Sequence, residues 1–161
     1  MSEDGDMTAH NDGIVTASRE TSAPADALFA LIADPAQQPR WDGNDNLAEA
    51  APGQRVRAVG DVFVMTNRNG GVRDNHVVAF AEGREIAWRP APQGEQPAGH
   101  QWGWELEPLA GGGTRITHTY DYTALPAEQE KRLAKARLMT SQKLMASIDR
   151  LAALAEEGGD S

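Results

Sequence analysis

The segment that most constrains this chain is its last long stretch, residues 125–157, which reads LPAEQEKRLAKARLMTSQKLMASIDRLAALAEE. The stretch has no glycine, and its one proline, Pro126, stands where a helix can begin. As a single helix it would run roughly 45 Å, at 1.5 Å per residue. A helix of that length needs a partner along one side, and the remaining chain offers mainly strand-like segments. The sequence therefore predicts a sheet wrapped around one long helix.

Seven segments have the β-branched content, alternation or flanking turns that are typical of strands. The later ones are joined by short glycine-containing turns such as Asn69-Gly70-Gly71, which indicate antiparallel neighbours. Residues 90–98 hold three prolines and are expected to form a loop. The predicted strands cover residues 14–22, 47–51, 60–68, 72–81, 84–89, 99–107 and 114–123.

Two short helices are expected after the first strand. Pro24 suits a first helical turn, and the apolar residues that follow it recur at helical spacing. The helix should end before Pro35, because the residue preceding a proline disfavours the helical region. Residues 35–41 can then hold only a turn or two of helix. Together these elements predict an α+β fold, a mostly antiparallel sheet with helices on one face.

The overall composition excludes several classes of function. With 24 acidic and 15 basic residues the formal charge is −9, which argues against nucleic-acid binding and against electrostatic attachment to anionic membranes. The chain has no cysteine, which excludes disulfides and thiolate metal sites and fits a cytoplasmic location. No run approaches eighteen apolar residues, so no membrane span is expected. We expect one domain over residues 13–157, between disordered tails at 1–12 and 158–161.

Five stretches carry a resemblance to a known superfamily. They are residues 24–35 (PADALFALIADP), Arg40-Trp41, residues 59–61 (VGD), residues 80–88 (FAEGREIAW) and residues 112–117 (GGTRIT). In this order they resemble the helix-grip fold of the START and birch-pollen-allergen superfamily. The chain is most similar to its bacterial polyketide cyclase/dehydrase and lipid-transport branch, often called SRPBCC.

This resemblance implies a specific architecture. A seven-stranded antiparallel sheet would curl around the C-terminal helix and enclose a deep, largely apolar cavity for a lipid, polyketide, sterol or similar ligand. Members of the superfamily range from carriers to cyclases and dehydratases and share no catalytic motif that can be transferred to this chain. We therefore expect binding of a small hydrophobic ligand, without a cofactor, by a monomer or homodimer.

The aromatic residues of the last two strands are candidates for the cavity wall. Alternation places His100, Trp102, Trp104 and Leu106 on one face of the first strand, and Ile116, His118, Tyr120 and Tyr122 on one face of the second. The two strands are consecutive, so we expect them to pair and their aromatic faces to join. Two interpretations stay open: these residues either line a cavity or simply fill the core.

Four further residues are candidate ligand contacts outside these strands. Trp41 either plugs the core beside the short helices or forms a wall of the cavity mouth. On the long helix, Arg137, Thr140 and Leu144 follow one apolar stripe. Arg137 either lies at the cavity rim with its head in water or pairs with an acidic group of the ligand.

Catalysis is the alternative hypothesis. His76 or His118 could act as acid or base, with Tyr120 polarising a carbonyl, in a cyclase or dehydratase reaction. His76, His100 and His118 lack the clustered spacing of metal ligands, so no metal site is expected. A third class is a protein-interaction module, similar to superfamily members that assist chaperones or form toxin–antitoxin-like pairs. It predicts a closed interior and an exposed apolar patch.

Overall fold

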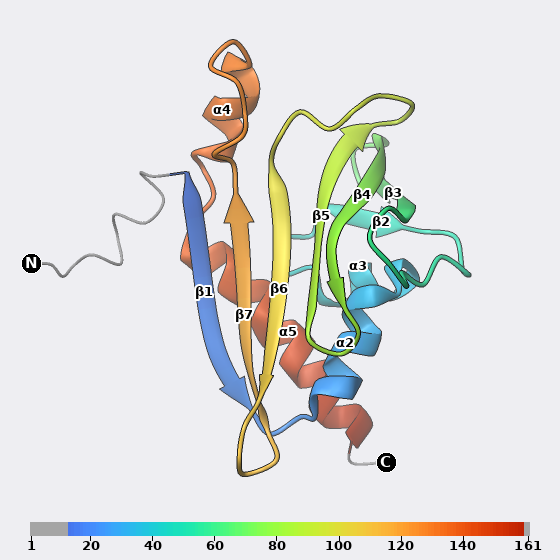
Figure 1. Ribbon diagram of the computed structural model, residues 1–161, viewed down its shortest axis with the longest axis vertical. Helices are drawn as coiled ribbons and strands as arrows, with labels where there is room; N and C mark the ends of the chain where they lie inside the picture. The colour runs from blue at the N-terminus through green and yellow to red at the C-terminus, as the bar shows by residue number, and fades with distance from the viewer. Residues whose placement is uncertain (1–12, 160–161) are drawn as a thin grey trace, which may run out of the picture.

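The computed structural model describes residues 13–159, so the predicted tail at 1–12 and the last two residues lie outside the described part. Figure 1 shows one long sheet with a helix running along its far side. The strands are β1 (Ile14–Thr21), β2 (Leu47–Glu49), β3 (Val62–Asn67), β4 (Val72–Ala81), β5 (Glu85–Pro92), β6 (Gln101–Pro108) and β7 (Thr114–Asp121). The helices are α2 (Ala25–Ala33), η2 (Pro35–Gln37), α3 (Gln38–Trp41), α4 (Glu130–Ala136) and α5 (Ser141–Gly159).

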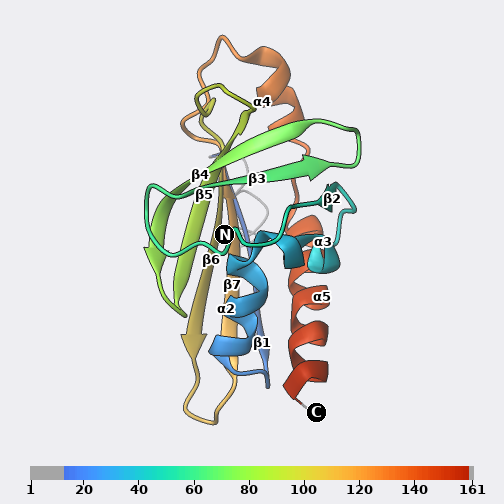
Figure 2. The same cartoon turned by 90° about the vertical axis from the view of Figure 1, so that its right-hand side faces the viewer.

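The sheet has seven strands in the order β1-β7-β6-β5-β4-β3-β2, and every neighbouring pair is antiparallel. The first strand pairs along its full length with the last, from Ile14 opposite Asp121 to Thr21 opposite Thr114. Figure 2 shows β3 and β4 turning across the end of the sheet toward the side that carries α2 and α5. This arrangement confirms the predicted α+β helix-grip fold.

One predicted strand is too short. β5 continues to Pro92, three residues past the predicted end, although it contains Pro90 and Pro92. Its pairing with β6 stops at Trp88 opposite Trp102, whereas its pairing with β4 continues to Pro92 opposite Arg73. Beyond Trp88, β5 is paired with β4 only, and its other edge has no partner strand. Pro90 and Pro92 fit here because their missing N–H groups are not needed for hydrogen bonds to a second neighbouring strand. The sheet therefore opens between β5 and β6 at this end.

The prediction of one continuous C-terminal helix is wrong. α4 ends at Ala136 and α5 begins at Ser141, with residues 137–140 between them. The hydroxyl of Thr140 accepts a hydrogen bond from the backbone N–H of Lys143 at 3.2 Å, which is the geometry of an N-cap. Thr140 therefore starts a new helix, and α4 stands beyond the end of the sheet, at the top of Figure 1.

The core forms between α5 and the inner face of the sheet. The α5 residues Leu144, Ile148, Leu151 and Ala155 are at most 3% exposed, as the predicted stripe required. α2 adds Leu28, Phe29 and Ile32 to the same core. The half of α5 nearest Gly159 is thus packed tightly, whereas its first turn lies beside the opening of the sheet.

Candidate ligand-binding cavity

A cavity of about 690 Å³ lies between the curled sheet and the segment from α4 to α5. This volume is within the range of small-molecule pockets, about 300–1,000 Å³. Its lining comes from α3, the loop after it, six strands (β2 to β7) and both C-terminal helices. All four tryptophans of the chain, Trp41, Trp88, Trp102 and Trp104, line it.

The wall formed by β6 and β7 is a continuous aromatic surface. Trp102 pairs across the strands with Tyr120, and Trp104 pairs with His118, so the predicted pairing is confirmed. The Trp104 and His118 rings stack with centroids 3.6 Å apart and planes 12° apart, and the Trp102 and Tyr120 centroids are 4.5 Å apart. Trp41 meets Trp104 edge-on at 5.1 Å. We call Trp41, Trp102, Trp104, His118 and Tyr120 the aromatic wall.

Trp41 has both of the roles considered for it. Its indole Nε1 donates a hydrogen bond to the Leu31 carbonyl at 2.8 Å, which ties α3 to α2. Its side chain is only 4% exposed and belongs to the core, yet it also lines the cavity.

The polar groups of the aromatic wall are uncharged at neutral pH. His118 Nδ1 lies 2.8 Å from the Gly103 carbonyl, which can only accept, so Nδ1 carries the proton and Nε2 of the neutral ring has a free lone pair. Burial lowers the pKa of His118 to about 4. Burial, and then the neighbouring Tyr122, raises the pKa of Tyr120 to about 12. The wall thus combines one acceptor, His118, with one phenolic donor, Tyr120.

The loop that follows α3 is fixed against α5 on the opposite side of the cavity. The Asp42 carboxylate accepts hydrogen bonds from the backbone N–H groups of Asn44, Asn46 and Leu47. The Gly43 N–H donates to the Ser147 hydroxyl at 3.0 Å. A Cβ at Gly43 would lie 2.4 Å from the Ala146 carbonyl carbon, so only glycine allows this approach.

The other end of the cavity is polar and positively charged. Sequence reasoning missed five basic residues of the lining, which we call the cationic mouth: Arg68, Arg73, Arg132, Lys135 and Lys143. They come from the β3–β4 turn, β4, α4 and the first turn of α5. Burial, and then the positive charges of Arg132, Lys135 and Arg73, lower the pKa of His100 to about 4. The signals available in the sequence were the alternation of Arg73 with Asn75 and Val77, and the i, i+3 spacing of Arg132 and Lys135.

Seven of the candidate site residues line the cavity: Trp41, His100, Trp102, Trp104, His118, Tyr120 and Leu144. Four do not line it: His76, Tyr122, Arg137 and Thr140. His76 lies on the face of β4 opposite Arg73 and Asn75, which line the cavity. Arg137 caps the C-terminus of α4 and is exposed, because the helix break removes it from the stripe. Thr140 caps α5, and Tyr122 packs in the core beside Tyr120.

Within residues 13–159 no group of three or more His, Asp or Glu side chains is arranged to hold a metal ion. None of the helices in the same range combines the length and apolar character needed to cross a membrane.

A curled antiparallel sheet that holds a C-terminal helix and a cavity between them defines a START-like helix-grip protein. Within that class the chain belongs to the family described as polyketide cyclase/dehydrase and lipid transport, whose model matches residues 13–156. The match covers nearly all of the part of the chain that the structure describes.

Individual relatives agree with this assignment. An uncharacterized protein of Mycobacterium tuberculosis, Rv0088, is 32% identical over 118 residues, covering 71% of this chain and 50% of its own length. The chain thus spans about half the length of the curated relatives it matches. The structure of NE0264 from Nitrosomonas europaea superposes with a TM-score of 0.65 at 16% identity, over 93% of this chain and 98% of that one. The structure of DynU16, a protein of the dynemicin biosynthetic locus, superposes with a TM-score of 0.60 at 21% identity, over 91% of this chain and 48% of that one. These two structures show a shared fold.

Proposed function

We propose that this protein binds a small, largely apolar ligand, lipid-like or polyketide-like, in the cavity between its sheet and its C-terminal helices. The observation that carries the proposal is the aromatic wall, which faces a cavity of about 690 Å³. Membership of a family described by polyketide cyclisation and lipid transport supports the same ligand class.

The aromatic wall supplies most of the expected binding energy. Its rings give a flat or chain-like ligand an apolar surface, while His118 and Tyr120 offer one acceptor and one donor to orient a polar group. Burying about 200 Å² of apolar ligand surface contributes about 5 kcal/mol before the costs of association.

Intrinsic fluorescence tests this proposal directly, because every tryptophan of the chain lines the cavity. Titration with phenylnaphthylamine, a neutral aromatic probe, should quench tryptophan emission and raise probe emission in a saturable way. Trp102→Ala should weaken binding about tenfold through lost apolar contact. Phe80→Ala is the matched control, because Phe80 packs against Phe29 and does not line the cavity. Equal binding by both variants, or none by the wild type, would contradict the proposal; native mass spectrometry of the purified protein would identify a retained ligand.

A second candidate function is a cyclase or dehydratase reaction on a polyketide-like substrate. It is favoured by the free Nε2 of neutral His118 beside the protonated phenol of Tyr120 on one wall, a base and a carbonyl-polarising acid. His118→Ala and Tyr120→Phe should then retain ligand binding and lose turnover. If no substitution in the aromatic wall changes the rate of turnover, this function is excluded.

The protein-interaction hypothesis is less well supported. It predicted a closed interior, whereas the structure has a cavity of about 690 Å³. The exposed large apolar residues within the described range, Ile14, Val59, Val62, Val78 and Leu138, are distributed over several elements. We therefore do not propose an interaction function.

A further inference from the structure

The charge of the cavity lining is opposite to that of the whole protein. The chain has a formal charge of −9, yet among residues 13–159 the cavity lining contains five basic side chains, the cationic mouth, and one acidic side chain, Asp42. Acidic residues outnumber basic ones in this chain, so a set of its side chains drawn at random would carry a net negative charge. The positive charge of the lining therefore needs a physical explanation.

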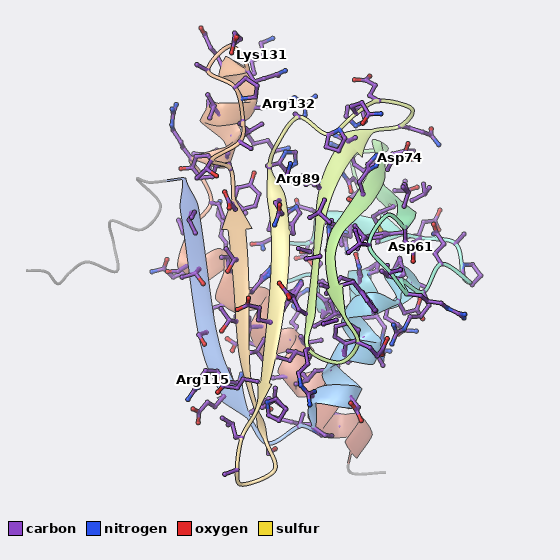
Figure 3. The ribbon with its side chains drawn as sticks, viewed as in Figure 1. Asp61, Asp74, Arg89, Arg115, Lys131 and Arg132 are labelled. Atoms are coloured by element: carbon purple, nitrogen blue, oxygen red, sulfur yellow. The ribbon has the colours of Figure 1, made fainter. Side chains whose placement is uncertain are left out.

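The five cations reach one end of the cavity from two sides. Arg132 and Lys135 lie on α4, and Lys143 lies in the first turn of α5. Arg68 and Arg73 flank the turn between β3 and β4. Figure 3 shows Arg132 on α4 beyond the end of the sheet, and Figure 2 shows β3 and β4 turned across that same end.

These cations are mostly without anionic partners. Within residues 13–159, the side chains of Arg73, Arg132, Lys135 and Lys143 form no ion pair. Arg68 approaches Asp45 only to 4.0 Å, and Asp45 already binds Arg150 at 3.0 Å. Outside the lining, Arg19, Arg55 and Arg115 each have a carboxylate partner at 2.7 Å, whereas other basic residues of the described range form no ion pair: Arg40, Arg57, Arg84, Arg89, Lys131 and Arg137. The cationic mouth is distinguished by the gathering of its unpaired charges around one cavity.

The one acidic residue of the lining does not neutralise the cationic mouth. Both Asp42 oxygens accept backbone hydrogen bonds from its own loop, at 2.7–3.2 Å. The positive field also converges on one point, because Arg132 and Lys135 from α4 and Arg73 from β4 all act on His100. Like charges that line the same end of a cavity repel one another, and an anion bound among them would relieve that repulsion.

We propose that the ligand is an amphiphilic anion, with its carboxylate or phosphate group held by the cationic mouth and its apolar body against the aromatic wall. This inference rests on the proposed function and narrows its ligand class. Arginine forks suit either oxyanion through paired hydrogen bonds, and the lysines add point charges. Lys143 donates a hydrogen bond to the Leu138 carbonyl and Arg73 donates one to the Val72 carbonyl, and the charged groups can otherwise be hydrated, which explains why these side chains tolerate the absence of anionic partners.

The test compares two probes that share an aromatic body and differ in one charge: anilinonaphthalene sulfonate and neutral phenylnaphthylamine. The sulfonate should bind more tightly, and its affinity should fall when the salt concentration is raised to about 0.5 M, while that of the neutral probe should not. Arg132→Gln combined with Lys135→Gln should weaken sulfonate binding about three- to tenfold and leave the neutral probe unchanged.

A matched control is present on the same segment. Lys131→Gln combined with Arg137→Gln removes the same two charges from exposed positions that do not line the cavity, and should leave both affinities unchanged. Arg132→Lys combined with Lys135→Arg keeps both charges and should retain sulfonate binding. Near-ultraviolet circular dichroism of each variant checks that the fold is intact.

Displacement of the bound sulfonate probe then identifies the head group. Dodecanoate or dodecyl phosphate should displace the probe at about tenfold lower concentration than dodecanol. Whichever of these two anions displaces it at the lower concentration identifies the preferred head group, carboxylate or phosphate. Equal displacement by dodecanol, or equal loss in the two double variants, would overturn the anion proposal while the neutral probe still demonstrates a ligand cavity. If neither probe binds, the proposed function itself fails.

Discussion

The aromatic wall and the cationic mouth line one cavity but are built by different rules. Four residues of the wall belong to two paired strands and the fifth, Trp41, ends α3; their ring centroids lie 3.6–5.1 Å apart along the wall. The mouth consists of single side chains from a turn, a strand and two helix ends, and most of them contact no carboxylate within the described residues. The wall therefore contributes both stability and binding, whereas the mouth should contribute binding almost alone.

The largest expected effect is on stability at the wall. Trp104 is 1% exposed, stacks on His118 and meets Trp41 edge-on, so Trp104→Ala should lower the free energy of unfolding by about 3–5 kcal/mol. Leu138→Ala at the mouth, where the side chain is 65% exposed, should change it by less than about 0.5 kcal/mol. Urea denaturation of the two variants measures the contrast. Similar losses at both positions would show that the two regions are not energetically distinct.

The wall was largely predictable because its signals are local. Alternation within two consecutive strands placed Trp102 and Trp104 on one face of the first strand and His118 and Tyr120 on one face of the second, and the short glycine turn between the strands implied that they pair. Short turns likewise predicted antiparallel neighbours among the later strands, whereas the pairing of β1 with β7 joins segments that are far apart in the sequence and has no local signal.

The mouth was not predictable, because its residues meet only through the tertiary fold. Arg73 and Arg132 are far apart in the sequence and carry no shared motif. The helix break has no glycine or proline to mark it, and it depends on the Thr140 cap. Treating residues 125–157 as one helix selected Arg137, whereas the break leaves that residue exposed and places Arg132 and Lys135 in the lining.

An intermediate effect should come from protonation of the wall. His118 has a pKa of about 4 in the folded protein and about 6.5 as a free group, so in this interval the unfolded chain binds a proton that the folded chain does not. The free energy of unfolding therefore has its full value, as far as His118 is concerned, above about pH 6.5. It decreases by about 3 kcal/mol as the pH falls from 6.5 to about 4.

Denaturation at several pH values checks this prediction. His118→Gln should remove about half of the dependence between pH 6.5 and 4, because His100 also has a pKa of about 4 and supplies the other half. Tyr120→Phe changes the same wall without removing an imidazole and should keep the full slope. A slope that is unchanged in His118→Gln would contradict the prediction.

The smallest expected effect concerns the cap that separates the two C-terminal helices. Thr140→Ala removes the hydrogen bond to the Lys143 N–H and should cost about 1 kcal/mol, or about 2–4 °C in Tm for a chain of this size. Thr140→Ser keeps the hydroxyl and should restore most of this loss. Because the cap fixes where α5 begins, it also sets the position of Lys143 relative to Arg132 and Lys135 across the break. Thr140→Ala should therefore reduce sulfonate binding more than binding of the neutral probe. An equal reduction for both probes would mean that the cap supports the whole cavity and not the mouth in particular.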